Sequence, residues 1–476
     1  PAFAHRSRCG TVPVSMARAP ISHPVRFILP RFGLVLLLAI AAIAPLRAQS
    51  ETSAAAAAER RILTTLEALT APELDGRLTG SAGNDRAAAF LAGRLDELGA
   101  EPLPGADTFL HSYSQPVIRS AGPPELTAHP ASGDPVTLRP GLDFDVLVRD
   151  GTRWSGEVTG PLRRLTPDRA RASWIRAHAD SVLVVSAGYF EELARNRSLM
   201  AALFSPDDGP RALALVLPEQ VRDLPRSLAI PNGRPANAGP MLVQLTHAAG
   251  RQLFELLDEA SPPRATVRAS YQVETRTVSN VAGVLSSGPA GQPGRPVVLC
   301  AHFDGPGRVS ESLYYPGAVD NASGVAVVLE AARDVTAGAR PLWVVLFNGE
   351  EQGLYGSRAF ADAREARLRG ATIINVDMVG HDPELPLSIS APSGIAAGEL
   401  ADRLAARLDE AGLTGRASPH GMSDHVSFGE LAAAASVVQA PYRFMHTPAD
   451  SVGRADAELL ARIADAVRMS AESYLR

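Results

Sequence analysis

The feature that most restricts the fold of this chain is an alternation of short apolar runs and amphipathic segments that begins near residue 280. The apolar runs have strand length and cover residues 297–301, 342–347, 372–376 and 435–438. The segments with helical periodicity cover residues 323–337, 357–368, 395–411 and 455–475. Continuous apolar strands separated by helices are typical of a sheet covered on both faces. The sequence therefore predicts an α/β fold with a mixed, mostly parallel central sheet and helices on both faces.

Histidine and acidic residues gather where these runs end. In chain order they are His302, Asp304, Asp320, Glu350, Glu351, Asp377 and His446. Because functional groups of such sheets collect beyond the carboxyl ends of the strands, we expect these side chains to lie together. Two imidazoles and three carboxylates suit a pair of divalent metals, zinc first, with cobalt and manganese also compatible. One further carboxylate is left to act as a base.

Each of these residues also has an ordinary structural interpretation. Asp320 precedes a turn of small residues that lets a bridging carboxylate approach two ions, but an aspartate there is also a good helix cap. His302, with Asp304 two residues later, fits a ligand whose ring a carboxylate orients, or a common strand-end histidine. His446 fits a ligand oriented by a neighbour within H-T-P-A-D, or a histidine that hydrogen-bonds inside a loop.

The adjacent pair Glu350 and Glu351 is the most informative element. Neighbouring like charges repel unless cations or protons compensate them. One glutamate can bind a metal while the other carries the proton of a water that the metals activate. A solvated pair is the alternative, which the flanking segments L-F-N-G and Q-G-L-Y-G disfavour. The joint occurrence of all seven residues favours the metal interpretation.

Five segments in combination resemble a known group of proteins. They are A-H-F-D, D-N-A-S-G, G-E-E-Q-G-L-Y-G-S, N-V-D-M-V-G and S-D-H-V-S-F. The chain resembles the co-catalytic zinc exopeptidases of the bacterial leucyl aminopeptidase and aminopeptidase Y type, relatives of glutamate carboxypeptidase II. The resemblance covers essentially the whole mature chain. It implies the zinc-exopeptidase fold, two Zn²⁺ ions, and peptide substrates with a free N-terminus.

The resemblance also implies a set of metal ligands. One ion would be held by His302 and Asp377, and the other by Glu351 and His446. Asp320 would bridge the two ions. The peptide bond that follows this bridging aspartate is implied to be cis.

Catalytic roles follow from the same resemblance. Glu350 would be the general acid and base, and Asp304 would orient the histidine ligand that lies two residues before it. Asp424, His425 and Tyr355 are candidates for contact with the substrate or the oxyanion. The triplet S-D-H suggests a serine triad, but sequence neighbours seldom form triads and the chain lacks a G-x-S-x-G elbow.

Residues 1–48 are predicted to be upstream residues and a signal peptide. A basic stretch leads into the apolar core Phe32–Leu46, which is too short for a comfortable membrane span. We expect cleavage before Gln49 and export to the periplasm or the medium; an uncleaved anchor is the alternative. The mature chain is expected to hold no stable membrane span. Cys300, its one thiol, lies in an apolar run and is predicted to be packed in the core.

Changes in sequence pattern divide the mature chain. We expect the N-terminal part of the catalytic domain at residues 49–150 and the catalytic metallopeptidase domain at 271–476. Between them, residues 151–270 are expected to form an inserted, small β-rich domain that resembles a protease-associated domain. The formal net charge of −5 is dispersed and gives no reason to expect nucleic acid as a partner. The sequence carries no signal for an oligomeric state.

The leading functional hypothesis is an exported, metal-dependent aminopeptidase. Glutaminyl cyclisation on the same scaffold is an alternative, which usually needs one zinc ion. An inactive binding protein of the transferrin-receptor kind is another, but such relatives lose ligands and this chain has all of them.

Overall fold

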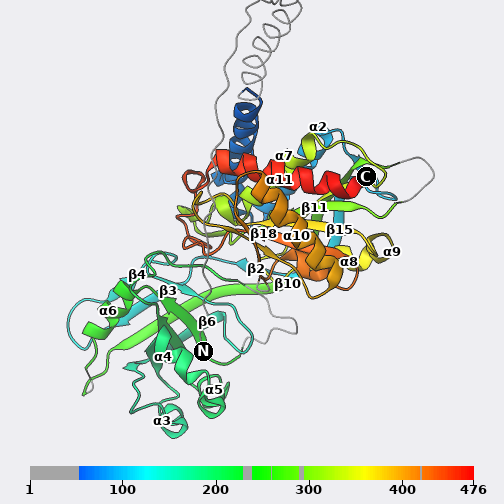
Figure 1. Ribbon diagram of the computed structural model, residues 1–476. Coiled ribbons are helices and arrows are strands. Elements are labelled where there is room, and N and C mark those ends of the chain that lie inside the picture. Colours follow the sequence, from blue (N-terminus) through cyan, green and yellow to red (C-terminus); the bar gives the residue numbers. More distant parts are fainter. Residues whose placement is uncertain (1–52, 229–237, 259, 289–293, 419–420) are drawn as a thin grey trace, which may run out of the picture. The chain divides into compact units, whose positions relative to one another are not determined.

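The computed structural model describes residues 53–228, 238–258, 260–288, 294–418 and 421–476 (Figure 1). The chain divides into two compact units, residues 1–54 and 55–476, and the second holds every element considered below. The predicted signal peptide lies outside the described residues. Within the described part of the chain, no helix has both the length and the apolar character that a membrane crossing requires.

A mixed sheet organises the C-terminal half of this unit. In spatial order its strands are β10 (Arg264–Ser286), β14 (Leu342–Phe347), β11 (Val297–His302), β15 (Thr372–Asp377), β18 (Ala433–Val438), β16 (Leu387–Ser390) and β17 (Gly415–Ser418). The four neighbours β14, β11, β15 and β18 are parallel, so their carboxyl ends share one edge. β10 and β16 are antiparallel to the strands beside them. The predicted mixed, mostly parallel sheet is confirmed.

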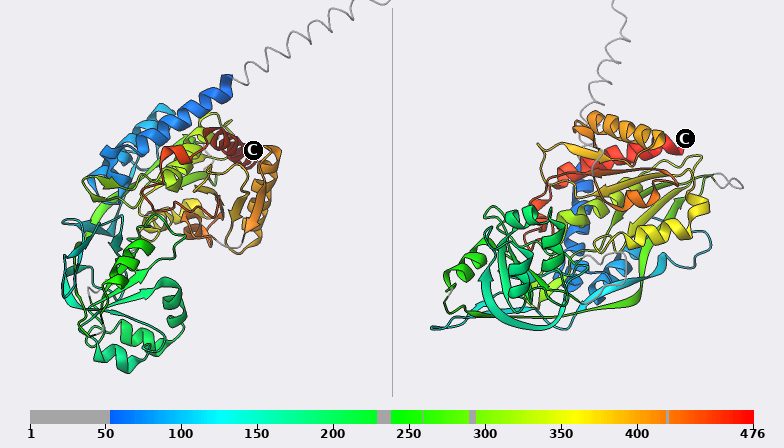
Figure 2. Two further views of the ribbon diagram at one scale, coloured as in Figure 1. Left: turned by 90° about the vertical axis from the view of Figure 1, so that its left-hand side faces the viewer. Right: turned by 90° about the horizontal axis from the view of Figure 1, so that it is seen from below.

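Helices cover both faces of this sheet because its strands are apolar on both sides. Leu299 and Leu346 pack in one core cluster, whereas Cys300 and Val345 pack in the cluster on the opposite face. The first cluster includes residues of the helix at 55–69, α2 (Ala82–Glu97), α7 (Gly324–Arg333), α10 (Ile395–Glu410) and α11 (Ala457–Leu475). The second includes residues of α8 (Tyr355–Ala363) and α9 (Glu365–Leu368). Figure 2 shows α10 and α11 side by side.

Two of the predicted helices differ from the structure by more than one or two residues at an end. α7 ends at Arg333 rather than at residue 337, because the amide of Thr336 donates to Glu472 Oε1 of α11 at 3.1 Å instead of continuing the helix. The helix predicted at 357–368 is two helices, since Arg364 leaves the helical region with φ of −118°.

A second set of strands forms the inserted region. Its strands are β3 (Glu125–His129), β4 (Val136–Leu138), β5 (Phe144–Val146), β6 (Ser155–Arg164), β7 (Val182–Ser186), β8 (Ala212–Val216) and β9 (Met241–Leu245). Its helices are α3 (Ala172–Ala177), α4 (Ala187–Leu193), α5 (Arg197–Leu203) and α6 (His247–Glu255). The strands from β6 to β9 are parallel, like the four neighbours β14, β11, β15 and β18. Its main core cluster includes Leu126 and Phe144, which precede the boundary predicted at residue 151.

β10 joins the two regions into one continuous sheet. Its residues 264–270 pair with β6, and residues 281–286 pair with β14. Between these stretches, residues 271–281 pair with β2 (Leu110–Ser120), and β1 (Glu101–Pro102) pairs near the end of β10. β12 (Arg308–Ser310) and β13 (Leu313–Tyr314) form a separate hairpin after β11. The inserted region and the C-terminal sheet therefore share one strand rather than meeting only through a linker.

Candidate metal centre

Six of the predicted side chains meet at the edge where the parallel strands end. They are His302 at the end of β11, Asp320 in the turn η2 (Ala318–Ser323), Glu350 and Glu351 after β14, Asp377 at the end of β15, and His446 after β18. The parallel pairing of β14, β11, β15 and β18 brings these residues together although they are far apart in the sequence.

The side chains form two groups that share one residue. In the first, His302 Nε2 lies 3.4 Å from Asp320 Oδ1 and 3.3 Å from Asp377 Oδ1. In the second, His446 Nε2 lies 3.1 Å from Asp320 Oδ2 and 2.8 Å from Glu351 Oε2. Within each group the potential ligand atoms all lie within 4.8 Å of one another. Asp320 presents one carboxylate oxygen to each group, which is the arrangement of a bridging ligand.

Asp320 is not the cap of the helix that follows it. The amide of Gly324, the first residue of α7, donates to Asn321 Oδ1 at 2.8 Å. The capping interpretation of Asp320 is therefore wrong, and its carboxylate is left to face the two histidines. The peptide bond between Asp320 and Asn321 is cis, as the resemblance implies.

Asp450 supports the turn that carries Asp320. Its carboxylate accepts the amides of Val319 at 2.8 Å and Asp320 at 3.1 Å, and the hydroxyl of Tyr442 donates to it at 2.8 Å. The sequence suggested that a neighbour in H-T-P-A-D orients the ring of His446. The structure places the aspartate of that segment on the backbone of η2 instead.

The chemistry of the two groups fits divalent cations. Asp377 Oδ1 and Glu351 Oε1 are buried and accept no hydrogen bond from any described residue. Buried charged oxygens are normally paired or bound to a metal. His302 is 1% exposed and Asp320 is 4% exposed. A buried set of imidazoles and carboxylates with unsatisfied oxygens is a donor set that zinc prefers.

Glu350 lies beside the first group but is set back from it. Its Oε2 is 4.0 Å from His302 Nε2. Burial raises the pKa of Glu350 well above its usual value, and Asp377 and Asp424 add to the rise against the opposing charge of His302. Although burial opposes it, the carboxylates of Glu350 and Asp377 raise the pKa of His302. A carboxyl group that holds a proton readily and faces the ligands is suited to proton transfer.

Asp304 connects three loops behind the ligands. It is fully buried, and its Oδ1 lies 3.5 Å from His302 Nδ1. The amides of Glu350 and Glu351 donate to its two oxygens at 3.2 Å each. The hydroxyl of Thr79 lies 3.1 Å from Oδ2. The sequence predicted the contact with the histidine, but it gave no indication of Thr79.

The candidates for substrate contact lie in η3 (Asp424–Phe428) and at the start of α8. Burial raises the pKa of Asp424 to about 7 and lowers that of His425 to about 4. His425 Nε2 lies 3.2 Å from Ser390 Oγ at the end of β16, so the S-D-H triplet does not form a local triad. Tyr355 begins α8 and is partly buried. No hydrogen bond between described residues links His425 or Tyr355 to the six ligand-type side chains.

A loop of the inserted region reaches the backbone of His446. The amide of Arg226 donates to the carbonyl of His446 at 2.8 Å. The side chain of Arg226 is buried 3.8 Å from Asp145 and lies over the ring of Tyr315. His446 has φ of 57°, which is uncommon for a residue other than glycine. The inserted region therefore helps to hold His446 in an unusual backbone conformation.

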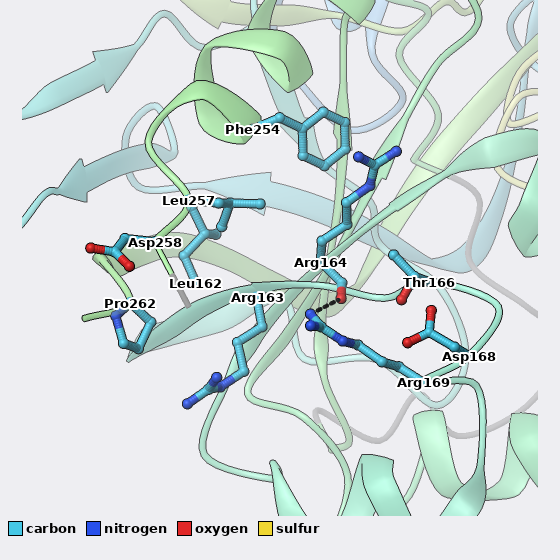
Figure 3. A pocket seen from close by; sticks show the side chains of 10 residues that line it. All are labelled: Leu162, Arg163, Arg164, Thr166, Asp168, Arg169, Phe254, Leu257, Asp258 and Pro262. Atoms are coloured by element: carbon cyan, nitrogen blue, oxygen red, sulfur yellow. Dashed lines mark hydrogen bonds between the residues drawn. The ribbon is translucent and has the colours of Figure 1, made fainter. Parts of the chain in front are cut away.

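A separate cavity of about 450 Å³ lies in the inserted region, between the end of β6 and α6 (Figure 3). Three arginines line it, but their guanidinium groups do not converge. Arg164 lies over the ring of Phe254 at 4.4 Å, and Arg169 donates to the carbonyl of Arg164. Arg163 points in another direction (Figure 3). None of the residues that line this cavity belongs to the two ligand groups.

Sequence comparison identifies relatives of the catalytic region. Residues 280–471 match peptidase family M28. A probable zinc metalloprotease of Pyricularia oryzae is 38% identical over 121 residues, which are 24% of this chain and 22% of that protein. One from Pyrenophora tritici-repentis is 42% identical over 97 residues, 19% of this chain and 22% of that protein. The chain spans about a fifth of the length of the curated relatives it matches.

Solved structures resemble the chain over most of its length. An aminopeptidase from Aneurinibacillus sp. strain AM-1 has a TM-score of 0.59 at 20% identity, covering 87% of this chain and 93% of that one. A zinc aminopeptidase from Bacillus subtilis has a TM-score of 0.60 at 20% identity, with coverage of 87% and 94%. A peptidase M28 precursor from Shewanella amazonensis SB2B has a TM-score of 0.62 at 18% identity, with coverage of 89% and 96%. At these identities the likeness shows a shared fold.

Proposed function

We propose that this chain, which carries a domain of peptidase family M28 at residues 280–471, is an exported aminopeptidase that uses two zinc ions to remove N-terminal residues from peptides. The resemblance to zinc exopeptidases that the motifs indicated is confirmed by this family match and by the shared fold. The number of ions, the substrate end and the export are the proposed parts.

One observation carries the proposal. Asp320 directs its two oxygens at two different histidine–carboxylate groups, His302 with Asp377 and His446 with Glu351. A single ion would engage one such group and leave the other buried and uncompensated. The shared aspartate therefore favours two ions over one.

The residues divide the chemistry between them. Zinc ions bound by the two groups would polarise the scissile carbonyl and lower the pKa of the attacking water. Glu350 would take a proton from that water and return it to the leaving amine. Asp304 would keep the His302 ring oriented and hold the backbone of the loop that presents Glu350.

The preference for the amino end of a peptide is supported by the likeness in fold, because the solved structures that resemble the chain include aminopeptidases from Aneurinibacillus sp. strain AM-1 and Bacillus subtilis. The proposal of export rests on the sequence alone, in which the apolar segment Phe32–Leu46 is interpreted as the core of a signal peptide.

The test uses the chain from Gln49 onward. Zinc content would be measured beside hydrolysis of aminoacyl-anilides, with N-acetylated anilides as matched controls. We expect about two zinc ions per chain and cleavage that requires a free amine and stops with a chelator.

Other outcomes would redirect the assignment. Conversion of an N-terminal glutamine to pyroglutamate without a released amino acid would show a cyclase. Stoichiometric metal without turnover on any peptide would show a binding protein. Cleavage of acetylated and free substrates at equal rates would contradict an aminopeptidase.

A further inference from the structure

A loop from the N-terminal part of the chain packs against the loops that carry the proposed metal ligands. It comprises the end of η1 (Pro72–Arg77) and the residues that lead from there into α2. Arg77 lies in this loop and is completely buried. Its guanidinium donates to the carbonyls of Phe303 at 2.7 Å, Pro316 at 2.7 Å and Gly317 at 2.9 Å, and also to Leu69. All four acceptors are backbone oxygens, so the buried cation is committed to holding loops in place.

Three of these carbonyls belong to the two loops that carry His302 and Asp320. Phe303 lies between His302 and Asp304, whereas Gly317 opens the turn that leads to Asp320. One rigid guanidinium therefore fixes the distance between the loop of His302 and the loop of Asp320. Arginine is suited to this task because its planar fork offers several donors in a fixed geometry.

Thr79, two residues later, reaches the third loop. Its hydroxyl lies 3.1 Å from Asp304 Oδ2 and 3.0 Å from Asn348 Oδ1. Asn348 precedes the Glu350–Glu351 pair and also exchanges hydrogen bonds with Asn84 of α2, at 2.8 and 3.0 Å. The segment from Arg77 to Thr79 thus contacts the loop after β11, the turn η2 and the loop after β14, each of which carries a proposed ligand.

Two glycines, one in this loop and one in the turn beside it, are packed too closely to accept a side chain. A side chain at Gly76 would place its Cβ 2.4 Å from the carbonyl oxygen of Gly307 and 2.5 Å from that of Tyr315. A Cβ at Gly317 would lie 2.5 Å from the carbonyl oxygen of Asp320 and 2.8 Å from Arg77 Nη2. Contacts this short require backbone to move, so the loop and the turn before Asp320 are packed at backbone distance.

The position of the cation also agrees with the charge of the centre. Burying an arginine without a paired carboxylate is normally costly. Burial lowers the pKa of Arg77, while the charges of Asp450, Asp304 and Asp320 act in the opposite direction. The acidic side chains therefore offset part of the cost of burying this cation, although none of them forms an ion pair with it among the described residues.

We propose that Arg77 and Thr79 are positioning residues of the metal centre, which set the separation of the loops that carry its ligands. This inference rests on the proposed function of that centre. Both residues lie outside residues 280–471, the segment that matches the peptidase family. The N-terminal part of the chain is then a component of the site rather than a cover for the sheet.

The experiment compares two conservative substitutions with two control substitutions. Thr79→Val removes one hydroxyl, and Arg77→Lys keeps the charge but loses the planar fork. Thr65→Val removes an equally buried hydroxyl that bonds only within its own helix, to Arg61. Arg61→Met breaks the bidentate contact with Glu330, which tethers the same N-terminal segment to α7.

Two measurements on metal-free protein decide the matter. In calorimetric titration with zinc chloride, we expect Thr79→Val and Arg77→Lys to bind at least one ion about 10–100-fold more weakly than the wild type. In hydrogen–deuterium exchange, we expect faster uptake in peptides that cover residues 303–323. The two controls should match the wild type in zinc affinity and in this segment, whatever their melting temperatures.

Each outcome has a distinct meaning. Zinc affinities of Thr79→Val and Arg77→Lys within twofold of the wild type, with unchanged exchange, would overturn the positioning role. If Arg77→Lys does not fold, Thr79→Val decides alone. A wild-type chain that takes up no zinc would overturn the proposed function, and exchange in residues 303–323 would then test the positioning by itself.

Discussion

The catalytic and inserted regions share a local architecture but use it differently. In both, neighbouring parallel strands bring their carboxyl ends to one edge of the sheet. In the inserted region two of these strand ends hold helix caps: Ser186 ends β7 and accepts an amide of α4, and Thr246 follows β9 and accepts an amide of α6. In the catalytic region the strand ends hold His302 and Asp377, whose side chains face other loops.

The difference shows that a position at the end of a parallel strand does not by itself make a site. A serine or threonine that caps its own helix satisfies local backbone amides. A site arises where several charged groups are buried, face one another across loops, and keep oxygens that no local group satisfies, as with Asp377 and Glu351. Four predictions test this contrast, from the largest expected effect to the smallest.

The largest effect is expected when a glutamate after a strand of the catalytic region is compared with a glutamate after a strand of the inserted region. Glu350→Gln should lower kcat by about 10²–10⁴-fold with zinc retained, because a proton carrier is lost and no ligand is removed. Glu219→Gln, after β8, changes an exposed glutamate at the equivalent place and should leave kcat unchanged. Steady-state kinetics and metal analysis check both. Near-full activity of Glu350→Gln would show that another group carries the proton.

Core truncation should separate stability from function. Leu213 of β8 and Leu346 of β14 are both completely buried, so replacement of either by alanine should lower the free energy of unfolding by about 2–5 kcal/mol. Leu346→Ala should also lower kcat, because the loop with Glu350 begins two residues later. Leu213→Ala should keep its zinc content and kcat at temperatures where it is folded. Urea titration and kinetics are the measurements, and loss of zinc from Leu213→Ala would break the contrast.

Acid should act through the buried histidine of η3. Burial lowers the pKa of His425 to about 4, so the folded chain resists a protonation that the unfolded chain accepts near its ordinary value. Stability contributed by this neutral ring is present above that value and is lost as the pH falls toward 4, by on the order of 3 kcal/mol.

The check compares His425→Gln with the wild type by urea unfolding at pH 7 and pH 4.5, with chelator present. The stability advantage of the wild type over the variant should shrink at the lower pH. Thr246→Ala, which removes no titratable group, should show the same difference from the wild type at both values. An unchanged gap for His425→Gln would contradict a neutral buried ring.

The smallest effect is expected from the caps. Thr246→Ala in the inserted region and Asp456→Ala at the start of α11 should each lower the free energy of unfolding by about 1 kcal/mol. Neither should change zinc content or kcat, because each side chain satisfies its own helix. Thermal unfolding and kinetics measure this, and a loss of activity in either variant would give these caps a role that their contacts do not explain.

The sequence was sufficient to predict the parts that depend on local pattern. Apolar runs located β11, β14 and β15, and the rule for strand ends then brought His302, Glu351 and Asp377 to one edge. The exclusion of Cys300 from chemistry also followed from its apolar run, and the thiol is buried. The ligand roles themselves stay predictions.

Other parts depended on contacts between distant segments. Arg77 and Thr79 lie more than two hundred residues before the loops that they bind, and no spacing rule connects them. Asp450 was placed beside its sequence neighbour His446, but its carboxylate bonds to a turn far upstream. The sequence shows only a polar, glycine-rich stretch, D-G-R-L-T-G-S, which does not reveal the loops that it contacts.

The composition of the main core cluster has a consequence for synthesis. Ile62, Leu66 and Leu91 pack in the same cluster as Val328 and Val467. A ribosome that adds about 5–20 residues per second would take roughly ten to fifty seconds between completing α2 and completing α7. During that interval the apolar faces of the first two helices lack the partners that α7 and α11 provide in the folded chain. The emerging chain therefore stays incompletely folded for long enough to be translocated across a membrane in an unfolded state. If no chaperone or translocation machinery binds it, the exposed apolar faces can aggregate.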